Sequence, residues 1–131
     1  MKDYTLLIER ASEVMKSSYA PYSGFNVGSA ILCADGSIYT GCNVESSSYG
    51  ATICAERSAL ASAIADGKRD FVAIAIVGGK NMSISEYVFP CGICRQVLSE
   101  LCQGTLEIVL FDGKKPKIYT LSKLFPNGFK L

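Results

Sequence analysis

Residues 71–77 read Phe-Val-Ala-Ile-Ala-Ile-Val, and two glycines, Gly78 and Gly79, follow them. A continuous apolar run of this length that ends at glycines predicts a β-strand buried on both faces. Such a strand needs a layer of helices on each side of its sheet. The stretch therefore predicts an α/β fold in which one sheet lies between two helical layers.

Predicted helices and strands alternate along the chain on both sides of this run. The predicted helices are residues 4–18, with a cap near Asp3, and residues 53–65 and 91–102. The other predicted strands are residues 25–33 and 37–44, which form a hairpin, and residues 106–111 and 117–120. The order strand, helix, strand, helix, strand from residue 37 to residue 111 predicts right-handed crossovers and mostly parallel pairing. Only residues 112–116 precede the last strand, too few for a parallel return, so we expect that strand to run antiparallel to its neighbour.

The length and composition agree with one domain spanning residues 1–131. Nearly half the residues are apolar (49%), which is enough to form a core, and the low charged fraction of 19% argues against disorder. We therefore expect a three-layer α/β/α sandwich whose five-stranded sheet is mixed.

The charge and the missing residue types exclude several partners and mechanisms. Thirteen Lys and Arg against 12 Asp and Glu give a net charge of +1 without a basic run, so nucleic acid is not an expected partner. No apolar stretch reaches the roughly 20 residues of a membrane helix, and the N-terminus has no secretory signal. We therefore expect a cytoplasmic protein that does not bind membranes and whose six cysteines stay reduced. The absence of histidine excludes Ser-His-Asp and Cys-His catalysis and any histidine zinc ligand.

The most informative local pattern is Pro90-Cys-Gly-Ile-Cys94, at the start of the helix predicted at residues 91–102. Two thiols three residues apart on a first helical turn can point at one ion, and the free N–H groups of a helix N-terminus favour thiolates. On its own, the pattern is compatible with half of a structural zinc site and with a redox-active dithiol.

A second pattern, Cys54-Ala-Glu-Arg57, opens the helix predicted at residues 53–65. Helix N-termini lie at the carboxyl edge of a parallel sheet, so Cys54, Cys91 and Cys94 can converge there. Three thiolates leave one tetrahedral position of a zinc ion to water, as in a catalytic site. Glu56 would face that water, although a first-turn Glu can also merely complement the helix dipole. Arg57 would offset the negative charge of the thiolates.

Further motifs occur along the chain, in the order Tyr19-Ala-Pro-Tyr-Ser-Gly-Phe25-Asn-Val-Gly28, Gly41-Cys-Asn43-Val-Glu45, Tyr49, Cys54-Ala-Glu-Arg57, Pro90-Cys-Gly-Ile-Cys-Arg-Gln96 and Pro126-Asn-Gly-Phe129. Together they resemble the motifs of the small homotetrameric zinc-dependent cytidine deaminases, and the resemblance spans nearly the whole chain. The loop at residues 46–48 reads Ser-Ser-Ser, where the family more often has Asn-Ala-Ser. The resemblance implies the cytidine deaminase fold, one zinc ion per subunit, and hydrolytic deamination of cytidine and 2′-deoxycytidine in pyrimidine salvage by a homotetramer.

The resemblance also implies which residues contact a nucleoside. Asn43 and Glu45 would hold the ribose, most directly its 3′-hydroxyl, and Phe25 would pack on the pyrimidine. The backbones of Ala55 and Cys91 would position the base. The residues implied to approach the pocket of a neighbouring subunit are Tyr49 and Phe129.

The mechanism expected from these residues uses one carboxylate twice. Glu56 would accept a proton from the attacking water, pass it to N3 of the ring, and then deliver a second proton to the departing amine. Two alternatives remain open. One is a deaminase of a cytosine nucleoside antibiotic of the blasticidin type, and the other is a non-catalytic zinc or dithiol module.

Overall fold

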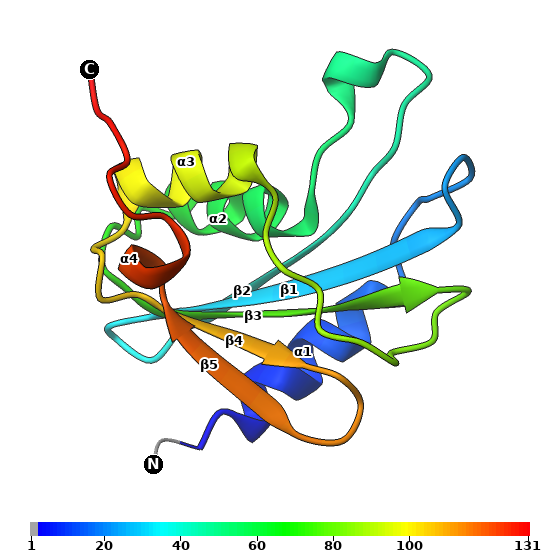
Figure 1. Cartoon of the computed structure of the whole chain (residues 1–131), viewed down its shortest axis with the longest axis horizontal. Helices are drawn as coiled ribbons and strands as arrows, with labels where there is room; N and C mark the ends of the chain where they lie inside the picture. Colours follow the sequence, from blue (N-terminus) through cyan, green and yellow to red (C-terminus); the bar gives the residue numbers. More distant parts are fainter. Residues whose placement is uncertain (1–2) are drawn as a thin grey trace.

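The computed structural model describes residues 3–131 and consists of one five-stranded sheet with helices on both faces (Figure 1). Helices α2 and α3 cover one face, and α1 covers the other. The strands are β1 (Phe25–Cys33), β2 (Ile38–Cys42), β3 (Phe71–Lys80), β4 (Glu107–Phe111) and β5 (Pro116–Thr120). The helices are α1 (Thr5–Met15), the single 3₁₀ turn η1 (Tyr49–Ala51), α2 (Ala55–Ala65), α3 (Gly92–Leu101) and the short α4 (Leu121–Leu124).

The prediction of mostly parallel pairing is wrong. The strand order is β2-β1-β3-β4-β5, and within residues 3–131 only β3 and β4 pair in parallel. Strand β1 lies between β2 and β3 and is antiparallel to both, so β2 and β3 run in the same direction, as the crossover predicts, without touching. The long, largely buried β1 can bond on both edges, whereas the short, half-buried β2 takes the edge of the sheet. The predicted antiparallel pairing of the last strand, β5, is confirmed.

The two faces of the sheet are packed by side chains of different size, and helices on both faces are confirmed. On the α2 and α3 face, large residues of the central strands such as Ile74, Ile76 and Ile108 are fully buried. On the α1 face, β3 presents Ala73, Ala75 and Val77 to the helix. Alternate residues of the run at 71–77 therefore contact different helical layers, which explains why the run has no polar position.

The structure extends some predicted elements and adds two short ones. Strand β3 continues through the glycines to Lys80 because β1 pairs with them, Val27 with Gly78 and Asn26 with Gly79. The predicted helix at residues 4–18 is shorter, since α1 ends at Met15. Sequence periodicity missed η1 and α4, which are too short to show a helical repeat.

Within residues 3–131, each helix is too short or too polar to span a membrane.

Close packing of α1 on β1 depends on Gly28, a glycine of the first motif. A Cβ atom at this position would lie 2.0 Å from the Ala11 carbonyl oxygen and 2.7 Å from the Met15 nitrogen, both backbone atoms of α1. We expect Gly28→Ala to lower the free energy of unfolding by about 3 kcal/mol, because the helix must move away from the sheet. Urea unfolding measures the change. Gly50→Ala is the matched control, since a Cβ atom there has no neighbour within 4 Å; equal stabilities of the two variants would contradict the prediction.

Candidate active site

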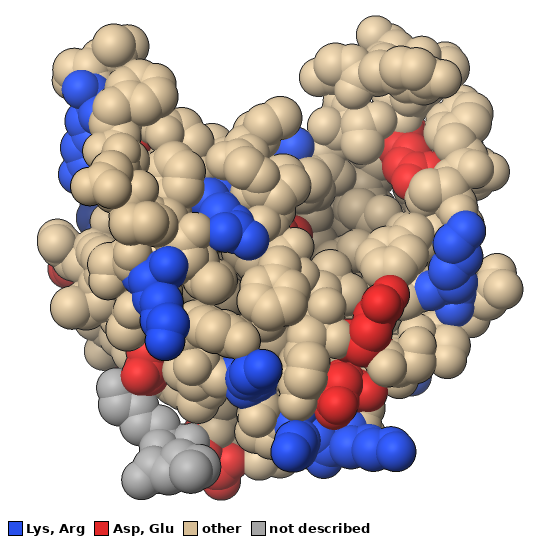
Figure 2. All heavy atoms as spheres, in the orientation of Figure 1, with Lys and Arg blue, Asp and Glu red and all other residues tan. Residues whose placement is uncertain are grey.

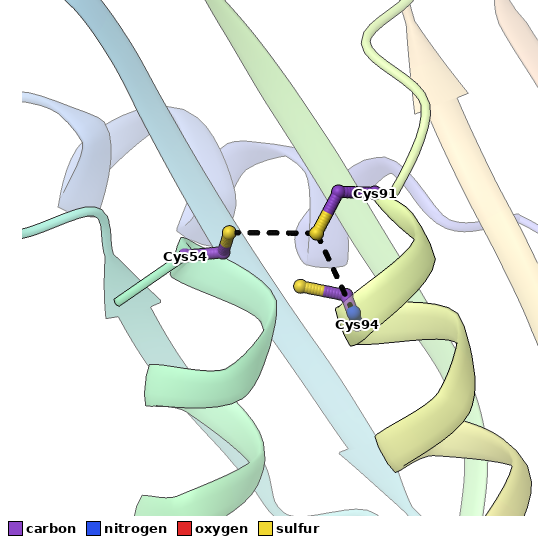
Figure 3. Close-up of side chains that lie close together, drawn as sticks. All are labelled: Cys54, Cys91 and Cys94. Carbon is purple, nitrogen blue, oxygen red and sulfur yellow. Dashed lines mark hydrogen bonds between the residues drawn. The ribbon is translucent and has the colours of Figure 1, made fainter. Parts of the chain in front are cut away.

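Three cysteine sulfurs meet between the N-termini of α2 and α3 (Figure 3). The sulfurs of Cys54, Cys91 and Cys94 all lie within 4.8 Å of one another, and the distance between those of Cys54 and Cys91 is 3.7 Å. Two thiolates at about 2.3 Å from one tetrahedral zinc ion would lie roughly 3.8 Å apart, so this spacing suits zinc. Among residues 3–131, no further Cys, Asp or Glu joins the group, and the chain has no histidine. The cluster therefore offers three ligands and leaves the fourth position open.

The helix ends place these sulfurs. Cys54 is the N-cap residue of α2 and Cys91 is the N-cap residue of α3, where the Cys91 sulfur accepts a hydrogen bond from the Cys94 backbone N–H at 3.4 Å. Cys94 lies on the first turn of α3 and is fully buried. Both helices follow strands that run in the same direction, so their N-termini lie at the same end of the sheet. The predicted convergence of the three thiols is confirmed.

Arg57 supplies positive charge next to the cluster. Its Nη2 donates a hydrogen bond to the Cys54 sulfur at 3.5 Å. Its Nε is buried and has no hydrogen-bond partner among the described residues. Hydrogen bonds from Cys94, Arg57 and Cys91 lower the pKa of the Cys54 thiol to about 5, whereas the bond to Cys54 and burial raise the pKa of Cys94 well above its usual range. A bound cation would favour the thiolate forms of the cysteines that hold it.

Glu56 is a buried carboxylate beside the thiols. It lies in the first turn of α2, and only 5% of it is exposed. Burial raises the pKa of its carboxyl group to about 7, and the negative charge of Cys54 contributes to this increase. A carboxyl group with a pKa near neutrality can accept a proton in one step and return it in another.

A cavity of about 230 Å³ lies in front of Glu56, Cys54 and Cys91. The space-filling view shows the surface notched between the C-terminal segment and the segment that carries η1 (Figure 2). Five residues that the resemblance assigns to a nucleoside line this cavity: Phe25, Asn43, Glu45, Ala55 and Cys91. The other lining residues, to which the motifs assign no role, are Ser23, Val27, Thr52, Ile53, Val88 and Phe89. Their only sequence signal is that they lie within the recognised motifs or a few residues from them.

Two of the assigned residues lie away from the cavity of their own chain. Tyr49, in η1, is 86% exposed, and Phe129, in the C-terminal tail, is 64% exposed. Gln96 of α3 holds the tail by donating a hydrogen bond to the Phe129 carbonyl at 3.0 Å. Large aromatic side chains this exposed are available for contact with another chain.

A larger hollow of about 950 Å³ lies along α1, on the opposite face of the sheet. Its lining includes Tyr4, Ile8 and Phe111 but none of the clustered thiols and none of the residues assigned to a nucleoside. Size alone would favour this hollow. The chemistry favours the smaller cavity, because only that one combines a buried carboxylate with the cluster.

Three thiols converge on the α/β/α framework, and beside them lies a buried carboxylate that is not part of the thiol cluster. This combination defines the class of zinc-dependent deaminases. Comparisons with known proteins give the family. Residues 1–110 match the model of the cytidine and deoxycytidylate deaminase zinc-binding region. The chain belongs to this family of zinc-binding deaminases, and it is an enzyme.

Similar proteins cover nearly the whole chain. A cytidine deaminase of Halalkalibacterium halodurans is 43% identical over 129 residues, which is 97% of this chain and 94% of that protein. A cytidine deaminase of Sporosarcina psychrophila is 42% identical and covers 97% of this chain and 91% of its own length. The crystal structure of cytidine deaminase from Burkholderia pseudomallei has a TM-score of 0.89 and 44% identity, and the match covers 98% of this chain and 100% of that one.

Proposed function

We propose that this chain, as a single domain of residues 1–131, hydrolyses the C4 amino group of cytidine and of 2′-deoxycytidine, releases ammonia, and serves pyrimidine salvage. The observation that carries the proposal is the position of Glu56, which is buried at the end of a cavity beside three clustered thiols. The family and the cytidine deaminases that resemble the chain along nearly all its length support cytidine as the substrate.

In this proposal, Cys54, Cys91 and Cys94 hold the zinc ion, and Arg57 offsets their charge. Zinc, when bound, supplies the Lewis acidity that activates water at neutral pH. Glu56 accepts a proton from the attacking water and delivers it to N3 of the pyrimidine, which makes C4 electrophilic. The same carboxylate then takes the proton of the hydroxyl group added at C4 and gives it to the amine, so that C4 becomes a carbonyl as its bond to nitrogen breaks and ammonia leaves. Its raised pKa, about 7, suits both transfers.

The walls of the cavity bind the nucleoside. Phe25 packs on the pyrimidine, and the backbones of Ala55 and Cys91 orient the base. Asn43 and Glu45 bind the ribose. The Asn43 amide accepts from the Val27 N–H at 2.9 Å and donates to the Phe25 carbonyl at 2.8 Å, which leaves one of its two N–H donors for a ligand. These roles follow from the family resemblance together with the shared cavity.

We also propose a homotetramer in the cytoplasm. The exposed aromatic side chains of Tyr49 and Phe129 would be covered by neighbouring subunits and would complete their pockets. The six cysteines are all free, and three of them must stay reduced to bind a metal, which favours a reducing compartment. Sedimentation equilibrium of the full chain tests the assembly, since a monomer at working concentration contradicts it.

The turnover of the zinc-loaded wild-type protein tests the function. We expect cytidine and 2′-deoxycytidine to lose the absorbance of the cytosine ring while ammonia is released in equal amount. Adenosine should not react, because the pocket is sized for one ring. Turnover of a blasticidin-type antibiotic without turnover of cytidine would contradict the substrate. Zinc binding without turnover of any of these compounds would contradict the enzymatic role.

A further inference from the structure

Ser23 connects the two walls of the cavity that the proposed function assigns to the base and to the ribose. Its hydroxyl accepts a hydrogen bond from the Phe25 backbone N–H at 3.0 Å and donates one to Oε2 of Glu45. Ser23, Phe25 and Glu45 all line the 230 Å³ cavity. One hydroxyl group therefore contacts both the backbone of the proposed base-packing residue and the carboxylate of the proposed ribose-binding residue.

The backbone around Ser23 holds the rest of the Glu45 carboxylate. Oε1 accepts hydrogen bonds from the backbone N–H groups of Tyr22, at 3.0 Å, and of Ser23, at 3.1 Å. A carboxylate has about four acceptor sites, two on each oxygen. Three are occupied here, so one acceptor site remains, on Oε2, the oxygen that Ser23 bonds. The hydrogen bonds from Ser23 and Tyr22 also lower the pKa of Glu45, so the group stays an ionised acceptor.

Among the described residues, Oε2 of Glu45 is held by the Ser23 hydroxyl, while the two backbone N–H groups hold only Oε1. Glu45 follows the end of β2 by three positions, in the connection that leads to α2. Without the hydroxyl, Oε2 has no partner among the described residues. The carboxylate can then turn while Oε1 keeps its hydrogen bonds to the backbone N–H groups, so the direction of Oε2 is no longer fixed. The Phe25 N–H would lose its partner in the same change.

We propose that Ser23 is a positioning residue that directs the free acceptor site of Glu45 Oε2 at the ribose 3′-hydroxyl, and so sets the preference of the site for nucleosides that carry this hydroxyl. The proposal rests on the proposed function, in which Glu45 binds the ribose. Ser23 itself transfers no proton to the substrate.

The test compares two substrates that differ at the ribose. In Ser23→Ala, we expect KM for cytidine to rise about tenfold, as for the loss of one hydrogen bond to a charged group, while kcat changes less than about twofold. KM for 2′,3′-dideoxycytidine, which has no 3′-hydroxyl, should stay as in the wild type. Ser23→Thr keeps the hydroxyl and should restore the cytidine value.

Two further variants make the comparison specific. Ser37→Ala is the matched control, because the Ser37 hydroxyl donates to Asp35 at 2.6 Å in the same kind of serine–carboxylate contact, at the distant β1–β2 turn. This variant should leave both KM values unchanged. Glu45→Gln should raise KM for cytidine, and adding Ser23→Ala to it should cause little further increase, because the two residues act through one interaction.

The outcomes separate this inference from the proposed function. No cytidine turnover by the wild type contradicts the proposed function itself. Equal wild-type KM values for the two nucleosides contradict ribose binding by Glu45 and overturn the inference with it. The decisive case is a wild type with a lower KM for cytidine than for 2′,3′-dideoxycytidine, a difference that Glu45→Gln removes. In that case the inference is overturned if Ser23→Ala leaves the cytidine KM unchanged. It is also overturned if Ser23→Ala raises the KM values of both nucleosides equally.

Discussion

Glu56→Gln is expected to lower kcat for cytidine by on the order of 10⁴-fold, at the upper end of what general acid–base catalysis contributes, because in the proposed mechanism one carboxyl group performs both proton transfers. The amide has nearly the same shape but cannot accept and return a proton. Stability should be kept, because burial disfavours the ionised carboxylate, as its raised pKa of about 7 indicates, and a neutral amide avoids that cost. Zinc content should also be kept, since Glu56 is not part of the sulfur cluster.

The measurements are initial rates at saturating cytidine, zinc per chain, and the midpoint of thermal unfolding. Glu9→Gln is the control, because Glu9 is an exposed acid on α1, on the other face of the sheet. We expect it to keep full activity. A Glu56→Gln protein that retains zinc and fold and still works within tenfold of the wild-type rate would exclude Glu56 as the proton-transfer group.

Cys91→Ser and Cys94→Ser are each expected to remove both zinc and activity. Loss of a residue that only hydrogen-bonds to a zinc ligand weakens zinc binding roughly 10–100-fold. Loss of a ligand itself should weaken binding more, because the serine hydroxyl is not ionised at neutral pH and cannot replace a thiolate. Both variants are needed because Cys94 is fully buried, so its substitution can disturb the packing of the core as well as zinc binding. Cys91 is exposed, so its substitution disturbs packing less. Zinc stabilises the folded state by binding to it, so both variants should also unfold at lower temperature than the zinc-loaded wild type.

The readout is zinc per chain after dialysis against a weak chelator, measured by atomic emission, with cytidine turnover on the same samples. Cys42→Ser is the control, a half-buried cysteine on β2 outside the cluster, and it should keep one zinc ion per chain. One full equivalent of zinc in Cys91→Ser and Cys94→Ser would contradict the proposed ligand set. Full activity of metal-free wild-type protein would exclude zinc from the reaction.

Element types and several of their boundaries could be predicted locally. Strand β1 occupies the predicted residues 25–33, and α3 lies within residues 91–102, with Cys91 and Cys102 as its caps. These elements have strong hydrophobic patterns and clear terminators. The two pairings made across short turns, β1 with β2 and β4 with β5, could also be predicted. The pairing of β3 with β1 could not, because hydrogen bonds along a strand edge do not depend on the side chains that make the pattern. The choice between β1 and β2 as neighbour of β3 is made by burial across the whole sheet.

Parts of the site could also be predicted from local sequence patterns. Cys54, Cys91, Cys94 and Glu56 have distinctive chemistry and lie at helix starts, and the topology of an α/β sheet brings such starts together. Ser23 offered no such signal, since an isolated serine beside a glycine is typical of any turn.

The amino-acid sequence by itself determined the three long helices, the five strands, the three thiols and the acid, because spacing along a chain fixes which side chains share one helix turn or one face of a strand. The tertiary structure alone decided that β1 separates β2 from β3, that Glu56 is buried deeply enough to raise its pKa, and that Ser23 reaches Glu45. Each of these depends on contacts between segments far apart in the chain, and their free energies are not encoded in any local window of residues.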